Sequence, residues 1–213
     1  MTQPGRFITL EGGEGAGKST NLSFVRDYLQ AHGIRVVTTR EPGGTPTAER
    51  IRALLLAGDD SDPLDDLAEL LLVFAGRAQH LARVIRPALA RGEWVVSDRF
   101  TDATFAYQGS ARGIASERIA LLEQFVQQGL TPELTLWLDM PIAHAADRLA
   151  ARGGERDRFE RERSDFFERV RQGYRARAEQ APERIVAVDA AQPLEQVQRD
   201  IAVLLDQQIA SWT

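Results

Sequence analysis

Hydrophobic and polar residues follow two alternating patterns along this chain. Five short runs rich in Val, Ile, Leu and Thr predict buried β-strands. Between them, apolar residues recur every three or four positions, which predicts amphipathic helices. The predicted strands cover residues 6–11, 34–39, 93–100, 134–139 and 184–189, and the predicted helices cover residues 19–31, 47–56, 64–91, 114–128, 142–151 and 193–209.

Strands that alternate with helices predict a parallel sheet with helices on both faces. No internal repeat, low-complexity tract or linker divides the sequence. We therefore expect one α/β domain over residues 1–213, built on a five-stranded parallel sheet. Residues 104–113 hold Tyr107 and Gln108 among small residues, and we expect them to form a binding loop.

The helix predicted over residues 64–91 is longer than one small domain needs for its own core. At 1.5 Å per residue it spans about 40 Å. Leu71, Leu72 and Val73 widen its apolar face near the middle. We expect a second buried surface there, and hence a homodimer through this helix; the alternative is a long helix that covers the sheet of a monomer.

Composition narrows the class of protein. The 213 residues are 43% hydrophobic and 27% charged, as in ordinary water-soluble domains, and include no cysteine. No run approaches the roughly 20 apolar residues of a membrane span, and no signal peptide is recognisable. The net charge of −5 argues against non-specific nucleic-acid binding. We expect a cytoplasmic protein that binds neither membrane nor nucleic acid.

Candidate chemistry begins directly after the first predicted strand, where residues 12–19 match the phosphate-binding pattern G-x-x-x-x-G-K-[ST]. Backbone N–H groups of such a loop, together with the following helix N-terminus, bind phosphate. Lys18 is the only lysine in the chain, and we expect it to reach the β- and γ-phosphates of a nucleotide. The residues expected to hold the nucleotide phosphates are Gly12, Gly13, Glu14, Gly15, Ala16, Gly17, Lys18, Ser19 and Thr20.

Two further features fit phosphoryl transfer. Asp98 and Arg99 end the third predicted strand, where an acid next to a phosphate loop commonly supplies a contact to Mg²⁺. We expect Ser19 and Asp98 to bind that ion. Glycine-flanked arginines after the fifth helix suggest a small mobile lid at about residues 148–163, which can close over the transferred group. The lid arginines are Arg152, Arg156 and Arg158.

Three classes of phosphate-loop protein compete at this point. A GTPase switch needs Asn-Lys-x-Asp, which is impossible because Asn21 and Lys18 are the only residues of their types. A transporter or motor ATPase would show its own signature loop and more chain. A small kinase needs a phosphate loop, a strand-end acid, an acceptor pocket and an arginine lid, all of which the sequence predicts.

Five motifs carry a more specific resemblance, at residues 11–20, 40–44, 74–77, 98–100 and 106–109. In this order and spacing they resemble the bacterial type of the thymidylate kinase family, over essentially the whole chain. The resemblance implies a P-loop NTPase fold like that of nucleoside monophosphate kinases. It also implies transfer of the ATP γ-phosphoryl group to dTMP, giving dTDP and ADP with Mg²⁺, in dTTP biosynthesis.

The resemblance also implies roles for individual residues. By similarity, Phe74 stacks on thymine, Arg77 hydrogen-bonds its edge, and Tyr107 and Gln108 line the base and sugar pocket. Arg40 and Arg99 hold the acceptor phosphate, Glu14 faces the 3′-hydroxyl, and Phe100 crowds the place of a 2′-hydroxyl. Ala103 replaces a residue that often carries a hydroxyl in the family, so one polar contact to the substrate is either missing or moved to Thr104. The turn at residues 189–193 matches the adenine site, where Arg148 stacks on the base.

The phosphate loop holds no arginine, so the catalytic arginine is expected to come from the lid, from Arg152, Arg156 or Arg158. Together with Lys18, Asp98 and Arg99, these form the predicted catalytic set. Two alternatives remain open. Another acceptor would keep the loop and lid but change the pocket around Phe74, Arg77 and Gln108, and a non-catalytic module would bind ATP without turnover.

Overall fold

The computed structural model describes residues 5–57, 61–152, 158–159 and 162–212, with the backbone alone for residues 149–152. Its five strands form one parallel sheet in the order β2-β3-β1-β4-β5. This confirms the predicted five-stranded parallel sheet. The strands are β1 Phe7–Glu11, β2 Val36–Arg40, β3 Trp94–Asp98, β4 Leu134–Asp139 and β5 Ile185–Asp189.

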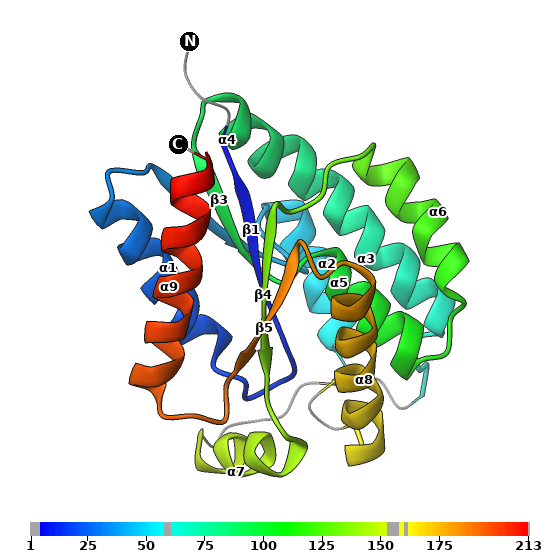
Figure 1. Cartoon of the computed structure of the whole chain (residues 1–213). Coiled ribbons are helices and arrows are strands. Elements are labelled where there is room, and N and C mark those ends of the chain that lie inside the picture. The colour runs from blue at the N-terminus through cyan, green and yellow to red at the C-terminus, as the bar shows by residue number, and fades with distance from the viewer. Residues whose placement is uncertain (1–4, 58–60, 153–157, 160–161, 213) are drawn as a thin grey trace.

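Helices cover both faces of the sheet (Figure 1). On one face, Ile8 and Leu10 of β1 pack against Val25 of α1 (Lys18–Ala31) and Ile201 of α9 (Leu194–Trp212). On the other, Phe7 packs against helical residues that follow α3. Both faces of the central strands are therefore buried, which explains why their sequence is almost continuously apolar. The α-helices are α1 Lys18–Ala31, α2 Pro46–Leu56, α3 Asp66–His80, α4 Arg86–Ala90, α5 Thr101–Thr104, α6 Ser116–Gln127, α7 Ile142–Arg152, α8 Ser164–Gln180 and α9 Leu194–Trp212, and two π-helical segments are η1 Leu81–Ile85 and η2 Phe105–Ala111.

The long helix predicted over residues 64–91 exists, but it is not a regular α-helix throughout. It consists of α3, η1 and α4 in sequence, and the Arg86 N–H donates to the carbonyl of Leu81, five residues earlier. Pro87 has no N–H to bond to the carbonyl of Arg83, four residues before it. The π-helical turn therefore lies at the point where this α-helical hydrogen bond is missing.

The expectation of a loop over residues 104–113 is wrong. These residues lie mainly in η2, which is buried against α8. The two helices approach closely at Gly173, where an added Cβ would lie 2.8 Å from the Cα of Ala106. That contact joins segments almost seventy residues apart, so no local pattern could reveal it.

The parallel register brings the carboxyl ends of three strands together. Asp98 of β3 pairs with Leu10 of β1 on one side and with Arg40 of β2 on the other. The opposite, amino edge of the sheet lies near the first and last described residues of the chain, as Figure 1 shows. There the guanidinium of Arg6 lies 5.2 Å from the ring centre of Trp212. No helix in the described part of the chain combines the length and apolar character that crossing a lipid bilayer requires.

Candidate active site

The phosphate-binding loop connects β1 to α1 at the carboxyl edge of the sheet. Gly12, Gly15 and Gly17 have φ values of 142°, 76° and 84°, which favour glycine. An added Cβ on Gly12 would also lie 2.7 Å from the carbonyl oxygen of Leu138. Lys18 Nζ donates to the carbonyls of Gly13 (2.8 Å) and Gly12 (3.2 Å), so the ammonium lies along the loop. Burial and the nearby Arg99 cation lower the pKa of Lys18.

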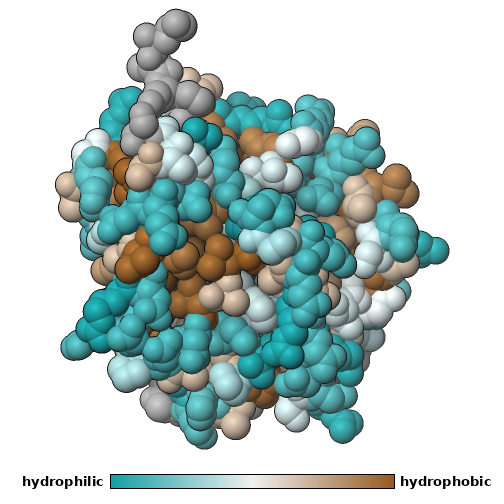
Figure 2. Space-filling model, viewed as in Figure 1, coloured by the Kyte–Doolittle hydropathy of each residue, from teal (hydrophilic) through white to brown (hydrophobic). Residues whose placement is uncertain are grey.

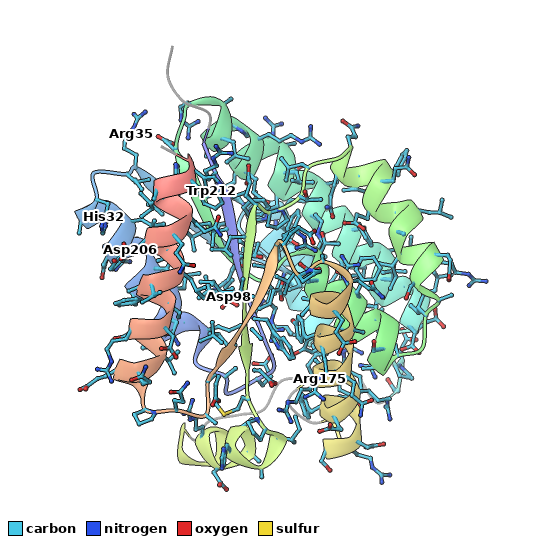
Figure 3. All side chains as sticks on the ribbon, in the orientation of Figure 1. His32, Arg35, Asp98, Arg175, Asp206 and Trp212 are labelled. Atoms are coloured by element: carbon cyan, nitrogen blue, oxygen red, sulfur yellow. The ribbon has the colours of Figure 1, made fainter. Side chains whose placement is uncertain are left out.

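Asp98 presents an oxygen suited to a cation. Its Oδ1 is buried and has no hydrogen-bond partner among the described residues. Asp98 lies within the molecule near the sheet (Figure 3) and lines the same cavity as Ser19. The described residues contain no cluster of three or more potential metal-binding side chains. Mg²⁺ commonly uses one or two protein oxygens and takes its other ligands from water and phosphate, so Asp98 and Ser19 fit such an ion.

Arg99 lies directly after β3 in a left-handed conformation, with φ 69°, which is unusual for a residue with a side chain. Its Nη1 donates to the carbonyl of Gly12 (2.9 Å) and the hydroxyl of Tyr174 (3.1 Å), and its Nη2 donates to Glu14. The guanidinium also lies over the ring of Tyr107, 4.7 Å from its centre. These contacts tie Arg99 to the phosphate loop.

Two acids at the phosphate loop, Glu14 and Glu11, have opposite pKa shifts. Burial raises the pKa of Glu14, but the charges of Arg99 and Lys18 outweigh it and lower the pKa to about 2. Burial, with a contribution from the charge of Asp102, raises the pKa of Glu11 to about 8. Glu11 accepts hydrogen bonds from the backbone N–H of Phe100 (2.7 Å) and from the hydroxyl of Tyr174 (2.8 Å). The sequence analysis assigned Glu11 and Tyr174 no role.

One cavity of about 660 Å³ runs along this edge of the sheet. It brings together most of the residues predicted for the site. Those that line it are Glu14, Gly15, Gly17, Lys18, Ser19, Thr20, Arg40, Arg77, Asp98, Arg99, Phe100, Thr104, Tyr107, Gln108 and Arg148. Phe74 is not among the lining residues, and Val73 beside it is.

Arg77 is a buried cation whose guanidinium is only partly satisfied. Its Nε donates to Glu41 (2.8 Å), and its Nη2 donates to the Thr104 hydroxyl (2.9 Å) and the Phe100 carbonyl (3.2 Å). Its Nη1 is buried without a partner among the described residues. Because Arg77 lines the cavity, this nitrogen is a hydrogen-bond donor suited to a ligand there.

Two aromatic rings and the carboxylate of Glu41 hold Arg77 in place. The guanidinium lies 4.8 Å from the ring centre of Phe74 and 5.0 Å from that of Phe100. Phe74 itself is buried in the core beside Leu70. Burial raises the pKa of Glu41, but Arg77 and His80 outweigh it and lower the pKa. Sequence reasoning missed both Glu41 and His80, which donates to Glu41 from Nδ1 at 2.9 Å.

Of the three predicted lid arginines, only Arg158 has a side chain among the described residues. The Arg158 Nε donates to the carbonyl of Leu55 (2.9 Å) and its Nη2 donates to Glu69, a buried acid on α3. The neighbouring Phe159 lines the cavity, with its ring centre 5.8 Å from that of Tyr107. Arg156 and the side chain of Arg152 lie outside the described residues.

Two further predicted residues that line the cavity are Arg148 and Arg40. Arg148 of α7 donates to the carbonyl of Ala190 (3.2 Å), which joins it to the turn at residues 189–193. Arg40 is half exposed and donates to Glu49 (2.8 Å). Arg40 and Arg148 therefore add to the positive charge that Arg77 and Arg99 bring to the cavity, an arrangement suited to ligands with several negative charges.

Comparisons with known proteins place this arrangement in a family. A family model described as Thymidylate kinase matches residues 10–201. A protein named thymidylate kinase from Chromohalobacter salexigens is 65% identical over 210 residues, 99% of this chain and 99% of the relative. A protein of the same name from Pseudomonas putida is 63% identical over 201 residues, 94% of this chain and 95% of the relative.

A solved structure agrees with the sequence relatives. The crystal structure of thymidylate kinase from Ehrlichia chaffeensis matches with a TM-score of 0.75 and 32% identity, covering 95% of this chain and 99% of that chain. The likeness confirms the predicted P-loop NTPase fold, of the kind found in nucleoside monophosphate kinases. The chain is thus a member of the thymidylate kinase family.

Proposed function

We propose that the protein transfers the γ-phosphoryl group of ATP to dTMP, giving dTDP and ADP. The observation that carries this proposal is that one continuous cavity is lined both by the phosphate loop and by Arg77, a buried guanidinium that is only partly satisfied among the described residues. A donor triphosphate at one end and a nucleotide acceptor at the other would meet within it. Holding two anionic substrates in line is most of what phosphoryl transfer requires of a protein.

At the acceptor end, Arg77 Nη1 would donate to a carbonyl on the edge of thymine. Tyr107 and Gln108 would line the base and sugar pocket, and Phe100 would crowd a 2′-hydroxyl. The Thr104 hydroxyl already accepts from Arg77, so we assign it to holding the arginine as well as to the pocket. Stacking of Phe74 on the base would require a shift of side chains, because Phe74 now packs beneath the Arg77 guanidinium.

The acceptor phosphate would lie between Arg40 and Arg99, with Glu14 near the 3′-hydroxyl. Glu14 now pairs with Arg99 and carries a lowered pKa, so it is ionised at neutral pH and can accept from a hydroxyl. An incoming phosphate would share the Arg99 guanidinium with this carboxylate. These assignments place positive charge on both sides of the transferred group.

At the donor end, the phosphate loop, Lys18, Ser19 and Thr20 would hold the ATP phosphates. Arg148 and the turn at residues 189–193, already hydrogen-bonded to each other, would hold adenine. Ser19 and the unpartnered Oδ1 of Asp98 would hold Mg²⁺. Such an ion neutralises charge on the phosphate oxygens when bound.

We propose that a lid arginine stabilises the transferred phosphoryl group. Arg158 now donates to Glu69 and to a backbone carbonyl, so it would have to leave both partners to reach the phosphates. Arg152 and Arg156 are the other candidates. A cation that arrives only with both substrates bound would favour transfer to the acceptor over transfer to water.

We further propose that the protein forms a homodimer through the long helix and resides in the cytoplasm. Large apolar side chains are exposed on three neighbouring helices, α2, α3 and α6. Hydrophobic surface is visible in Figure 2 at the right-hand edge, where Figure 1 places α6. The exposed side chains are Leu54, Leu67, Leu71, Leu121 and Phe125. Exposed apolar side chains on neighbouring helices favour protein association.

A coupled assay of ADP release tests the function. With ATP and Mg²⁺, dTMP should give the highest kcat/KM among dTMP, dUMP, CMP, AMP and thymidine. A higher value for thymidine or CMP would overturn the proposal in favour of another kinase. ATP binding without turnover of any acceptor would instead indicate a non-catalytic module.

A further inference from the structure

Glu69 is a buried carboxylate that contacts Gln108, one of the residues that line the cavity. It lies on α3, two turns before Arg77, and its side chain has no solvent exposure. One carboxylate oxygen, Oε1, accepts from Gln108 Nε2 at 2.7 Å. The other, Oε2, accepts from Arg158 and lies 3.5 Å from Arg112 Nη2. The two arginines offset the charge of this buried carboxylate.

The contact with Glu69 fixes which end of the Gln108 amide faces it. An ionised carboxylate has no hydrogen to donate, so only the NH₂ end of the amide can bond to it. Gln108 is itself buried and lines the cavity. The carbonyl Oε1 is therefore the end of the amide available to accept a hydrogen bond from a ligand. A rotation by 180° would place two acceptors against each other, which is unfavourable in a buried site.

Pyrimidine bases differ at the group that would meet this oxygen. Thymine and uracil carry an N–H donor at ring position 3, whereas the same nitrogen in cytosine is a bare acceptor. A pocket that presents a carbonyl oxygen pairs with the first kind and leaves the second unpaired. Buried polar groups left unpaired by the wrong ligand are a strong source of specificity.

We infer that Glu69 is a specificity-determining residue that holds the Gln108 amide with its carbonyl oxygen toward the acceptor base, and so selects thymine and uracil over cytosine. The inference rests on the proposed function, because it takes Gln108 to face the base. Glu69 touches no substrate in this account; it acts through Gln108. A purely structural role, as an anchor for Arg158 and Arg112, would affect all acceptors alike.

The substitution Glu69→Gln tests this role. A neutral amide at position 69 can accept or donate, so Gln108 becomes free to adopt either orientation. We expect the ratio of kcat/KM for dTMP to kcat/KM for dCMP to fall about tenfold in Glu69→Gln, the effect of one exchanged hydrogen bond. The ratio for dTMP to dUMP should stay within twofold, because both bases carry the same N–H donor. Any change in the lid affects every acceptor and cancels in these ratios.

Two further variants complete the experiment. Asp66→Asn, on the same helix and near Arg112 but not bonded to Gln108, should leave both ratios unchanged. In a Gln108→Leu background, Glu69→Gln should have no further effect on the dTMP to dCMP ratio, and this comparison remains informative if the single variant is unstable. An unchanged dTMP to dCMP ratio in Glu69→Gln, or an equal change in the Gln108→Leu background, overturns the inference. Failure of the wild-type protein to phosphorylate dTMP would instead overturn the proposed function.

Discussion

Lys18 shows how one side chain depends on its surroundings. Its ammonium lies between two carbonyl oxygens of the loop, 2.8 and 3.2 Å away, at the floor of the cavity. A guanidinium is planar, larger and presents its donors in a fixed fork. The 25 other basic residues of the chain are all arginine, so this position alone keeps the compact cation.

We therefore predict that Lys18→Arg lowers kcat/KM for ATP at least 100-fold, because the larger group cannot occupy the space between loop and phosphates. Steady-state kinetics at saturating dTMP measures this. The reverse exchange Arg26→Lys, at an exposed residue paired with Asp27, should leave activity unchanged. A Lys18→Arg enzyme within threefold of wild type would show that charge alone suffices.

The raised pKa of Glu11 leads to a prediction about how folding stability depends on pH. Its folded-state pKa of about 8 lies above the usual 4.5, mainly because it is buried. Between pH 5 and 8 the unfolded chain therefore loses this proton while the folded chain keeps it, and stability falls as pH rises. The contribution is up to about 1.4 kcal/mol per pH unit.

Glu11→Gln removes that proton equilibrium. Urea unfolding at pH 5.5, 6.5 and 7.5 should show a steeper loss of unfolding free energy in the wild type than in Glu11→Gln. Glu117→Gln, at an exposed residue of α6, should follow the wild-type slope. Parallel curves for Glu11→Gln and wild type would mean that Glu11 is already ionised in the folded protein at pH 5.5.

At the residue scale, sequence reasoning found the cavity-lining groups that belong to contiguous motifs, such as Lys18 and Asp98. It missed three buried acids that hydrogen-bond to other residues lining the cavity: Glu11, Glu41 and Glu69. Their partners are distant in sequence: Glu41 bonds to Arg77, 36 residues away, and Glu69 to Gln108, 39 residues away. The sequence did contain one signal for Glu69. It lies four residues before Val73 and eight before Arg77, so it is a charged residue on the apolar face of a helix.

At the scale of elements, all five strands and the larger helices other than α8 were predicted, because each carries its own hydrophobic period. The two π-helical segments could not. One arises where Pro87 removes a backbone donor, and the other lies in a segment buried by α8. Both depend on hydrogen bonding and packing that a count of apolar spacings does not describe.

The lid segment carries a prediction of its own. We expect Arg158→Ala to lower kcat by 100-fold or more, because a cation is lost beside the transferred phosphoryl group, while KM for dTMP changes less than fivefold. Arg163→Ala, at an exposed arginine near the start of α8, provides the control. If the only role of Arg158 is its contact with Glu69, Arg158→Ala will keep the wild-type kcat and will change KM for dTMP instead.

At the scale of the whole molecule, the exposed leucines of α3 predict association. Light scattering should give a mass near twice the 23.6 kDa of one chain, and Leu71→Glu should reduce it to one chain, because a charge would be buried at the interface. Val203→Glu, at a comparably exposed residue of α9, should leave the mass unchanged. A wild-type protein that is monomeric at micromolar concentration contradicts the dimer.

The stacking of Arg6 on Trp212 puts the first and last described turns of the chain side by side, across the sheet from the cavity. A short linker could join these ends and new termini could be opened elsewhere, for example in the turn after α6, without crossing the catalytic edge. For the same reason, an enzyme immobilised on a solid support through either end would keep its substrate entrance facing the solution.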